Sequence, residues 1–383
     1  TMHGLEELLS DEMLKLGARD IEIHKRAVSF VGDQGFLYKA NLCSRVALSI
    51  LKHVKTFTAI DQHQLYDEIK NISWEDYMGA DDTLAVDCSL NSQYFNHSLF
   101  VAQKTKDAIV DRLKEKFGKR PSVDLENPTL RVDLHYYKDT CTVSLNSSGA
   151  PLFKRGYRTF AEKAPINEVL AAGMVLLSGW DKRSNFVDPM CGSGTLAIEA
   201  ALIAGNIPPG YYRENFGFMN WKDYDEELWK KISESSIGKI SNEQPAIYAS
   251  DISATAIRVA GENIVNAKVD DAIKLKKIAI ENIEPPQGRG IAIINPPYGE
   301  RLNSGEDIAM FYKTIGDTMK KKFSGYDVWI ISSNMEALKN IGLRPTRRIT
   351  LFNGALECKF LKFSIYDGTK KIHKLKEKDT NNE

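Results

Sequence analysis

The sequence has little of what marks three common classes of protein. Its five cysteines are widely spaced and form no Cys-x-x-Cys pair, and its seven histidines are also scattered, which argues against a disulfide framework and a metal site. Its apolar runs are much shorter than the roughly 20 residues that a membrane-spanning helix needs. No basic-then-apolar leader opens the sequence. We therefore expect a cytoplasmic protein that binds neither a metal nor a membrane.

An excess of charge of one sign is also missing. Fifty-one Lys and Arg residues balance fifty-one Asp and Glu residues, so the formal net charge is zero. A polyanionic partner would therefore have to be bound by local basic patches. The apolar fraction of 43% and the charged fraction of 27% are those of ordinary globular domains. A length of 383 residues suits two or three such domains.

The first 155 residues mix helices with short alternating segments. Helical spacing over 4–16 ends at Gly17, and the alternation at 130–134 and 142–145 predicts half-exposed antiparallel strands. This part of the chain is therefore expected to be α+β. A long helix is predicted upstream of these strands, with an apolar face that consists of Leu99, Ala102, Ile109, Leu113 and Phe117.

From about residue 160, helical segments alternate with short apolar runs. This pattern is typical of a doubly wound, mostly parallel sheet. Two final runs, at 348–352 and 360–365, predict an antiparallel pair that closes the sheet. A long excursion between the first helix and the second strand carries Phe216, Phe218 and Trp221, and we expect it to pack on the domain edge. The predicted parallel strands lie at 186–188, 246–250, 291–294 and 328–331.

A glycine-rich turn follows the first of these strands. Residues 188–195 read Asp-Pro-Met-Cys-Gly-Ser-Gly-Thr, and the glycines allow a tight turn and a close approach to a ligand. The carboxylate of Asp188 can accept from a donor's amino group, and that of Asp251, after the second strand, can accept from ribose hydroxyls. Ala197 replaces the third glycine of the dinucleotide fingerprint. The loop therefore favours S-adenosylmethionine over a nicotinamide cofactor.

The residues Asn-Pro-Pro-Tyr at 295–298 follow the third strand directly. Two prolines make this turn rigid and extended, so that it presents the Asn295 side-chain oxygen and the Pro296 carbonyl as acceptors. Two acceptors aimed at the hydrogens of an exocyclic base amine would favour the form whose lone pair can attack a methyl group in line. Tyr298 offers a face on which a flipped-out base can stack. Catalysis of this kind depends on positioning rather than on a general base.

Both motifs resemble those of a known family. The loop at 188–195 and the Asn-Pro-Pro-Tyr-Gly-Glu-Arg stretch at 295–301 are similar to those of bacterial 23S rRNA guanine-N2 methyltransferases. Shorter relatives of these enzymes are described as adenine-N6-specific DNA methylases. Front-half segments at 81–83, 95–98, 118–124 and 154–158 resemble the RNA-binding THUMP domain of the same family.

The resemblance implies a domain order and a partner. It implies an N-terminal ferredoxin-like region over 1–55, a THUMP domain over 56–158 and a class I, Rossmann-like methyltransferase domain over 159–366. That domain should have a mostly parallel, seven-stranded sheet, and a charged tail over 367–383 should follow it. The expected partner is a structured RNA, most plainly 23S rRNA, and no obligate protein partner is evident.

Candidate site residues follow from the motifs. The family places an acid after the third strand, where this sequence has Ala279, and Asn282 is the candidate replacement. Predicted catalytic residues are Asn295, Pro296, Pro297 and Tyr298. Predicted donor-binding residues are Asp188, Pro189, Cys191, Gly192, Gly194, Thr195, Asp251, Ile252 and Asn282. Predicted phosphate-contacting residues are Lys119, Arg120, Lys154, Arg155 and Arg158.

Three functions stay open at this point. The leading hypothesis is methylation of guanine N2 in 23S rRNA, with S-adenosylhomocysteine as the product. Methylation of adenine N6 in RNA or DNA is the first alternative, because the same turn serves both amines. An RNA-binding protein with an inactive methyltransferase domain is the second, and Ala279 is the feature that favours it.

Overall fold

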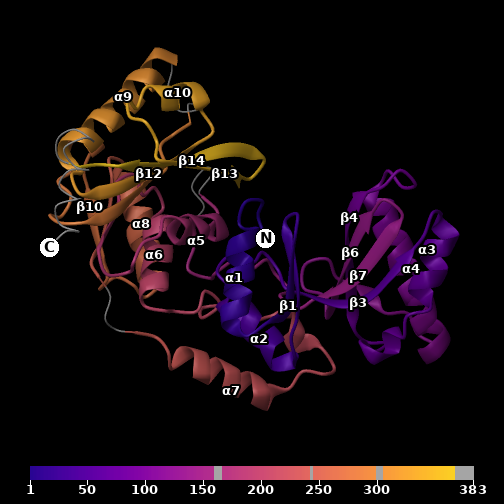
Figure 1. Ribbon diagram of the computed structural model, residues 1–383. Coiled ribbons are helices and arrows are strands. Elements are labelled where there is room, and N and C mark those ends of the chain that lie inside the picture. Colours follow the sequence, from indigo (N-terminus) through magenta and orange to yellow (C-terminus); the bar gives the residue numbers. More distant parts are fainter. Residues whose placement is uncertain (159–165, 242–244, 299–304, 367–383) are drawn as a thin grey trace.

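The computed structural model describes residues 1–158, 166–241, 245–298 and 305–366. We call residues 1–158 the front half and residues 166–366 the rear half. The strands form a two-stranded, a five-stranded and a seven-stranded sheet. In Figure 1 the two sheets of the front half and the sheet of the rear half form separate parts with helices packed against them.

The chain begins with a β-hairpin flanked by two helices. The first helix stops at Gly17, whose φ of 111° is left-handed, and the second is capped by Asp33, which accepts from the Phe36 amide. The predicted helix end at Gly17 is confirmed. The elements are α1 Glu6–Leu16, β1 Arg19–His24, β2 Ala27–Val31 and α2 Gln34–Cys43.

The second part is a five-stranded sheet with α3 and α4 on one face (Figure 1). The predicted antiparallel pair is confirmed as β6 and β7, and β4 runs parallel to β6. The elements are β3 Leu51–Thr58, α3 Gln62–Lys70, the 3-10 turn η1 Trp74–Asp76, β4 Thr83–Asn91, α4 Ser98–Phe117, β5 Ser122–Val123, β6 Leu130–Tyr137 and β7 Thr140–Asn146.

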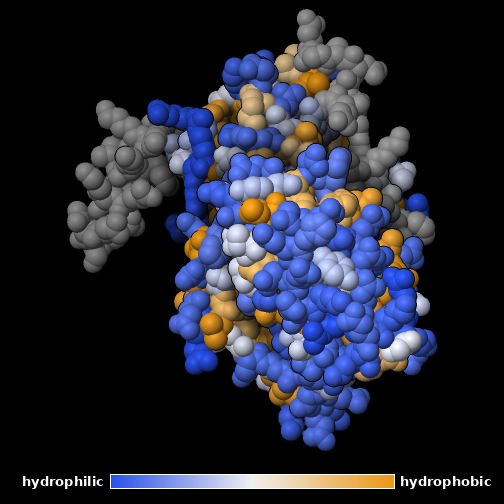
Figure 2. All heavy atoms as spheres, turned by 90° about the vertical axis from the view of Figure 1, so that its right-hand side faces the viewer, coloured by the Kyte–Doolittle hydropathy of each residue, from blue (hydrophilic) through white to orange (hydrophobic). Residues whose placement is uncertain are grey.

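The predicted apolar face of α4 is right in the middle of the helix and wrong at its ends. Ala102, Ile109 and Leu113 are buried, whereas Leu99 is 69% exposed and Phe117 is 42% exposed. Leu99 is the second residue of the helix and Phe117 is its last. Figure 2 looks onto this side of the molecule and shows a mainly hydrophilic surface with small, separate apolar islands. Single exposed apolar residues of this kind are normal on a soluble surface.

The rear half has the predicted doubly wound sheet. Its strand order is β10-β9-β8-β11-β12-β14-β13, in which the first five strands are parallel and β14 is antiparallel to both of its neighbours. The charged tail expected at 367–383 lies outside the described residues. The strands are β8 Asn185–Asp188, β9 Ile247–Asp251, β10 Ile273–Lys277, β11 Gly290–Ile294, β12 Tyr326–Ser332, β13 Arg347–Asn353 and β14 Leu356–Ser364.

The helices of the rear half cover both faces of this sheet, except α7, which packs against α2 of the front half (Figure 1). The long apolar stretch of α6 is buried along its whole length except at its last residue, as expected of a helix enclosed by other elements. The helical elements are α5 Glu168–Leu177, α6 Thr195–Ala204, η2 Gly217–Asn220, α7 Glu226–Ile237, α8 Ala254–Asn266, η3 Ile280–Asn282, α9 Gly305–Lys322 and α10 Met335–Lys339. No helix among these or elsewhere in the described chain is both long and apolar enough to span a membrane.

The excursion at 205–225, which we call the bridging segment, joins the two halves. The Arg213 guanidinium donates to the carbonyls of Ser148, Ala150, Pro151 and Lys154, at 2.9 to 3.1 Å. A Cβ at Gly217 would lie 2.6 Å from the Asn146 carbonyl oxygen, so only glycine fits there. The expectation that this segment packs on the domain edge is confirmed, and the surface on which it packs belongs to the front half.

Candidate functional site

The candidate site lies at the carboxyl edge of the seven-stranded sheet. β8 is central, with β9 and β10 on one side and β11 and β12 on the other, so the strand order reverses between β8 and β11. In open α/β sheets, ligands bind outside the strand ends at such a reversal. The glycine-rich loop follows β8, Asp251 ends β9, and the Asn-Pro-Pro-Tyr turn follows β11. The structure thus brings the two predicted motifs to one edge.

The glycine-rich loop is held from β9 and α8. The Asp251 carboxylate accepts from the amides of Gly192 and Ser253, at 3.0 and 2.8 Å. Gly194 has a φ of +82°, and a Cβ there would lie 3.2 Å from the Cβ of Ala260. The Asn263 side-chain amide donates to the Ser193 carbonyl at 3.0 Å. Asp251 therefore shapes the loop in addition to any contact with a ligand.

Asp188, the acid that begins this loop, is fully buried. Neither carboxylate oxygen has a hydrogen-bond partner of normal geometry among the described residues, and the side chain is inaccessible to solvent. Burial and the nearby Asp251 carboxylate raise the pKa of Asp188 to about 8, although the amides of Met190 and Ala197 oppose the rise. An unpartnered buried carboxyl is costly. It is therefore suited to a ligand that brings a positive charge.

The Asn-Pro-Pro-Tyr turn is held by its backbone. The Pro297 carbonyl accepts from the Tyr312 hydroxyl at 3.4 Å, and the Tyr298 carbonyl accepts from the Asn334 side chain at 3.1 Å. The Tyr312 hydroxyl also bonds the Ser332 hydroxyl at 2.7 Å. These contacts come from α9 and from the end of β12.

Sequence reasoning missed these supporting residues. Asn334 has a recognisable signal, because it caps the short helix α10 by accepting from the Ala337 amide. The Ser-Ser-Asn stretch at 332–334 directly follows the apolar part of β12, whose end lies at the same sheet edge. A polar triplet at a parallel strand end was therefore available as a clue.

The side chains of Asn295 and Tyr298 are bonded to each other. The Tyr298 hydroxyl donates to Asn295 Oδ1 at 2.9 Å. Burial, followed by the nearby Cys358, raises the pKa of Tyr298 well above its usual value, so the hydroxyl keeps its proton. An amide oxygen has two lone pairs, so Asn295 can still accept from a second donor. Half-buried Tyr298 therefore fixes the orientation of Asn295.

The remaining donor-site candidates differ in exposure. Ile252 is 68% exposed directly after Asp251, which leaves an apolar side chain free at the sheet edge. Asn282 is exposed at the end of η3, which follows β10 and packs against α9. Pro189, Cys191 and Thr195 are buried within the loop and the start of α6.

The structure corrects two of the predicted phosphate contacts. Arg155 is 2% exposed and lies 3.4 Å from the buried carboxylate of Glu199, so the prediction that it contacts a phosphate was wrong. Arg158 donates to the Thr195 hydroxyl at 2.8 Å and to the Ile166 carbonyl at 3.0 Å, so its guanidinium is also used within the protein. Both are withdrawn as phosphate contacts. Lys119, Arg120 and Lys154 are exposed.

Residues 154–158, which we call the clamp segment, instead hold the helix that opens the site. Tyr157 donates its hydroxyl to Glu199 at 3.1 Å, beside the Arg155 contact. Thr195 and Glu199 are four residues apart, so they lie on one face of α6. The clamp segment therefore grips the first turn of α6, immediately after the glycine-rich loop.

Comparisons with known proteins agree with this arrangement. The RMKL-like methyltransferase domain model matches residues 155–362, the THUMP domain model matches residues 59–146, and the RlmL ferredoxin-like domain model matches residues 1–51. These ranges agree with the predicted domain order, while the predicted boundaries themselves stay predictions.

Individual relatives cover nearly the whole chain. The ribosomal RNA large subunit methyltransferase K/L of Syntrophotalea carbinolica is 39% identical over 94% of this chain, which spans about half of that relative (52%). The solved structure of SMU.472, described as "a putative methyltransferase complexed with SAH", has a TM-score of 0.86, 28% identity and coverage of 96% and 97% of the two chains.

A third relative carries a different substrate in its name. It is a predicted N6-adenine-specific DNA methylase from Listeria monocytogenes str. 4b F2365, with a TM-score of 0.85, 30% identity and coverage of 95% and 94%. The family match spans more than half of the chain, and the resemblance inferred from the two motifs is confirmed. The chain therefore belongs to the RMKL-like methyltransferase family and carries a THUMP domain in front of its methyltransferase domain.

Proposed function

We propose that this chain is an S-adenosylmethionine-dependent RNA methyltransferase that acts on an exocyclic base amine. The observation that carries the proposal is the meeting of the glycine-rich loop after β8 and the Asn-Pro-Pro-Tyr turn after β11 at one sheet edge. The first motif fits a methyl donor and the second fits a planar amine. Neither motif alone distinguishes this chemistry from a dinucleotide site or from a proline-stiffened strand end.

The residues of the loop fit the donor. Bound S-adenosylmethionine would supply an electrophilic sulfonium methyl group and leave as S-adenosylhomocysteine, the ligand named for the SMU.472 structure. Buried Asp188 would pair with the donor's ammonium, and Asp251 would accept from its ribose while holding Gly192. Exposed Ile252 would cover an aromatic ring of the donor. Asn282 is the weaker member of this set, because it stands in place of the acid that the family has at the position of Ala279.

The turn would position the acceptor amine. Asn295 Oδ1 and the Pro296 carbonyl would each accept one N–H, with Tyr298 keeping the Asn295 oxygen directed to the site. The nitrogen–carbon bond forms as the sulfur–carbon bond breaks, and the amine then loses a proton to solvent. The protein contributes preorganised acceptors rather than a base of unusual pKa. The base has to be unpaired or flipped out.

Guanine N2 of 23S rRNA is the substrate that we propose first. The THUMP match and the name of the K/L relative support an rRNA substrate, and Lys119, Arg120 and Lys154 are exposed cations that would contact phosphates. Adenine N6 is the second candidate, supported by the description of the Listeria relative. The proposed site of action is the cytoplasm, where rRNA is made in bacteria.

The proposal is tested by binding and transfer together. S-adenosylhomocysteine should bind with a saturable heat signal, and tritium from labelled S-adenosylmethionine should enter large-subunit rRNA but not duplex DNA. Saturable binding with transfer to DNA alone would favour the adenine-N6 alternative on DNA. Absence of binding would contradict an enzyme and support an inactive RNA-binding protein.

A further inference from the structure

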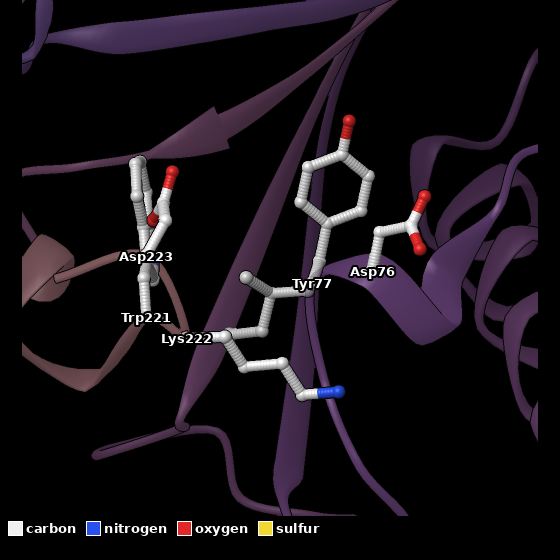
Figure 3. Close-up of a pocket in the computed structure, with 6 residues that line it drawn as sticks. Asp76, Tyr77, Trp221, Lys222 and Asp223 are labelled. Carbon is white, nitrogen blue, oxygen red and sulfur yellow. The ribbon is translucent and has the colours of Figure 1, made fainter.

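A cavity lies between the two halves, and none of its lining residues belongs to the methyl-transfer site. Its volume is about 220 Å³. Figure 3 shows its walls, which come from η1 and β6 of the THUMP domain and from the bridging segment. The lining residues are Asp76, Tyr77, Leu130, Trp221, Lys222 and Asp223.

The apolar part of the cavity suits a flat ring. Tyr77 and Trp221 stand on opposite sides of the open space in Figure 3, and buried Leu130 adds an aliphatic surface. The Tyr77 ring is supported by an edge contact with Trp74, with 6.1 Å between the ring centroids. The Lys52 ammonium lies 5.4 Å from the centre of the Trp221 ring. Aromatic walls of this kind bind nucleobases by stacking.

The charges at the cavity balance. The Asp223 carboxylate accepts from Lys52 at 2.8 Å, and the Lys222 ammonium donates to the Glu75 carbonyl at 2.8 Å. Asp76 points away from Trp221, beyond Tyr77 (Figure 3). A phosphate between the two rings would meet the Asp223 carboxylate, and an organic cation would meet the Lys222 ammonium in the wall and Lys52 beside Trp221. A neutral ligand is therefore favoured.

Asp223 selects among neutral ligands. Only one of its oxygens accepts from a described residue, so the other is available to a ligand. A carboxylate can only accept, and it therefore favours a ring that carries an N–H donor such as an exocyclic amine. Adenine, cytosine and guanine have this group, and uracil does not.

The size of the cavity limits the ligand to one base. At about 30 Å³ for each water, this space would hold roughly seven waters. It is smaller than the roughly 300–1,000 Å³ of pockets for drug-sized molecules. Arg213 and Gly217 fix the bridging segment on the front half, and the Lys222 ammonium joins it to the Glu75 carbonyl beside Tyr77, so both walls are in place without a ligand.

We propose that this cavity binds one unpaired, amine-bearing nucleobase of the RNA substrate, separate from the base that is methylated. The inference rests on the proposed RNA substrate and adds a second point of recognition to it. A base held here contacts both the THUMP domain and the methyltransferase domain. It therefore fixes the register of the RNA relative to the methyl-transfer site.

The test uses the full chain and fluorescein-labelled A10 and U10 oligoribonucleotides in an anisotropy titration. The wild-type protein should bind A10 more tightly than U10. Tyr77→Ala should weaken A10 binding about tenfold, because stacking of one base is worth roughly 1–3 kcal/mol and about 1.4 kcal/mol is tenfold. Asp223→Asn should reduce the preference for A10 over U10. Tyr94→Ala, which removes a THUMP aromatic that is 43% exposed outside the cavity, should leave both affinities within about twofold.

S-adenosylhomocysteine binding reports on folding, and it should be equal in all four proteins. Equal binding of A10 and U10 by the wild type, or equal losses in Tyr77→Ala and Tyr94→Ala, would overturn the proposal. Displacement of A10 by spermidine from the wild type but not from Tyr77→Ala would assign the cavity to a cation and also overturn it. In each of these cases continued binding of an rRNA fragment keeps the proposed function, whereas failure of the wild type to bind any RNA rejects both.

Discussion

The Asn-Pro-Pro-Tyr turn at 295–298 and the clamp segment at 154–158 are both short and rigid, but they are held through different groups. The turn is fixed through its backbone carbonyls, by Tyr312 and Asn334, so the Asn295 oxygen keeps a free lone pair. The clamp segment is fixed through its side chains, which bond inward to α6.

This difference separates groups that serve the substrate from groups that serve the fold. When bonds to the backbone hold a segment in place, its side chains remain able to contact a ligand, as at Asn295. Arg155 and Arg158 each lie within 3.4 Å of a buried carboxylate, that of Glu199 and that of Glu168, and removing one partner of a buried charge pair is costly. Their contribution to activity therefore comes through α6 and the loop before it.

The largest expected effect is at the turn. Asn295→Ala should lower the rate constant of methyl transfer by about 100-fold or more, the usual loss when one preorganised polar group is removed from a transition state. The affinity for S-adenosylhomocysteine should stay within about twofold, because Asn295 lies on the acceptor side. Single-turnover transfer and calorimetry measure the two quantities. A loss of donor affinity as large as the loss of rate would contradict this role. It would show that Asn295 supports the structure of the site, as Arg155 and Arg158 do.

The second effect concerns the buried acid. The pKa of Asp188 is about 8 in the folded protein, against an ordinary 3.8, so its carboxyl stays neutral in the fold while it ionises in the unfolded chain. The free energy of unfolding should therefore fall as pH rises from about 4 to about 8. Asp188→Asn should remove this fall and raise the free energy of unfolding at pH 8 by more than about 1.4 kcal/mol, the equivalent of one pKa unit.

The same substitution should harm donor binding. If Asp188 ionises when it meets the donor's ammonium, the affinity for S-adenosylhomocysteine should rise between pH 6 and pH 7, by up to about tenfold. Asp188→Asn should bind more weakly and show no such rise. Urea unfolding and calorimetry at each pH provide the data. A wild-type affinity independent of pH would show that the carboxyl does not change its charge on binding.

The third effect distinguishes two neighbours in the clamp segment. Arg158→Met should weaken S-adenosylhomocysteine binding about tenfold, because loss of its bond to Thr195 releases the first turn of α6; a hydrogen bond to a charged group contributes about 1.5–3 kcal/mol. Arg158→Lys should restore part of the affinity. Exposed Lys154→Met is the matched control and should leave donor binding unchanged.

The effects of Lys154→Met and Arg158→Met on RNA affinity should be the reverse of their effects on donor affinity. Lys154→Met should weaken RNA binding a few-fold, while Arg158→Met should leave it within about twofold at equal folded fraction. Filter binding to an rRNA fragment measures it. If both variants lost RNA affinity and neither lost donor affinity, Arg158 would be a phosphate contact after all.

The smallest effect is electrostatic. Lys119 is exposed and its one ion pair within the described residues is with exposed Asp81, so its ammonium is accessible to a phosphate. Lys119→Gln should reduce the slope of log affinity against log salt by about 1 and weaken RNA binding modestly. The slope is measured between low and moderate potassium chloride. An unchanged slope would remove Lys119 from the RNA-binding surface.

Much of the fold followed from sequence patterns because those patterns are local. Apolar runs ending at Asp188 and Asn295 predicted the strands, and the motifs that follow these strands lie at one edge of the sheet. Contacts that join distant segments could not be predicted, since charge alone does not reveal burial. Arg155 and Arg158 were predicted to contact phosphates, although their guanidinium groups contact Glu199 and Thr195 of α6. The cavity between Tyr77 and Trp221 was equally hidden, because its walls are more than 140 residues apart.

The most direct test of the central claim is nucleoside mass spectrometry of large-subunit rRNA after reaction with deuterium-labelled S-adenosylmethionine, for the wild type and for Asn295→Ala. The account predicts label on an exocyclic amine, most directly as N2-methylguanosine, with the wild type and at least about 100-fold less with the variant. Label on a ribose hydroxyl or a ring carbon, or equal labelling by both proteins, would contradict it.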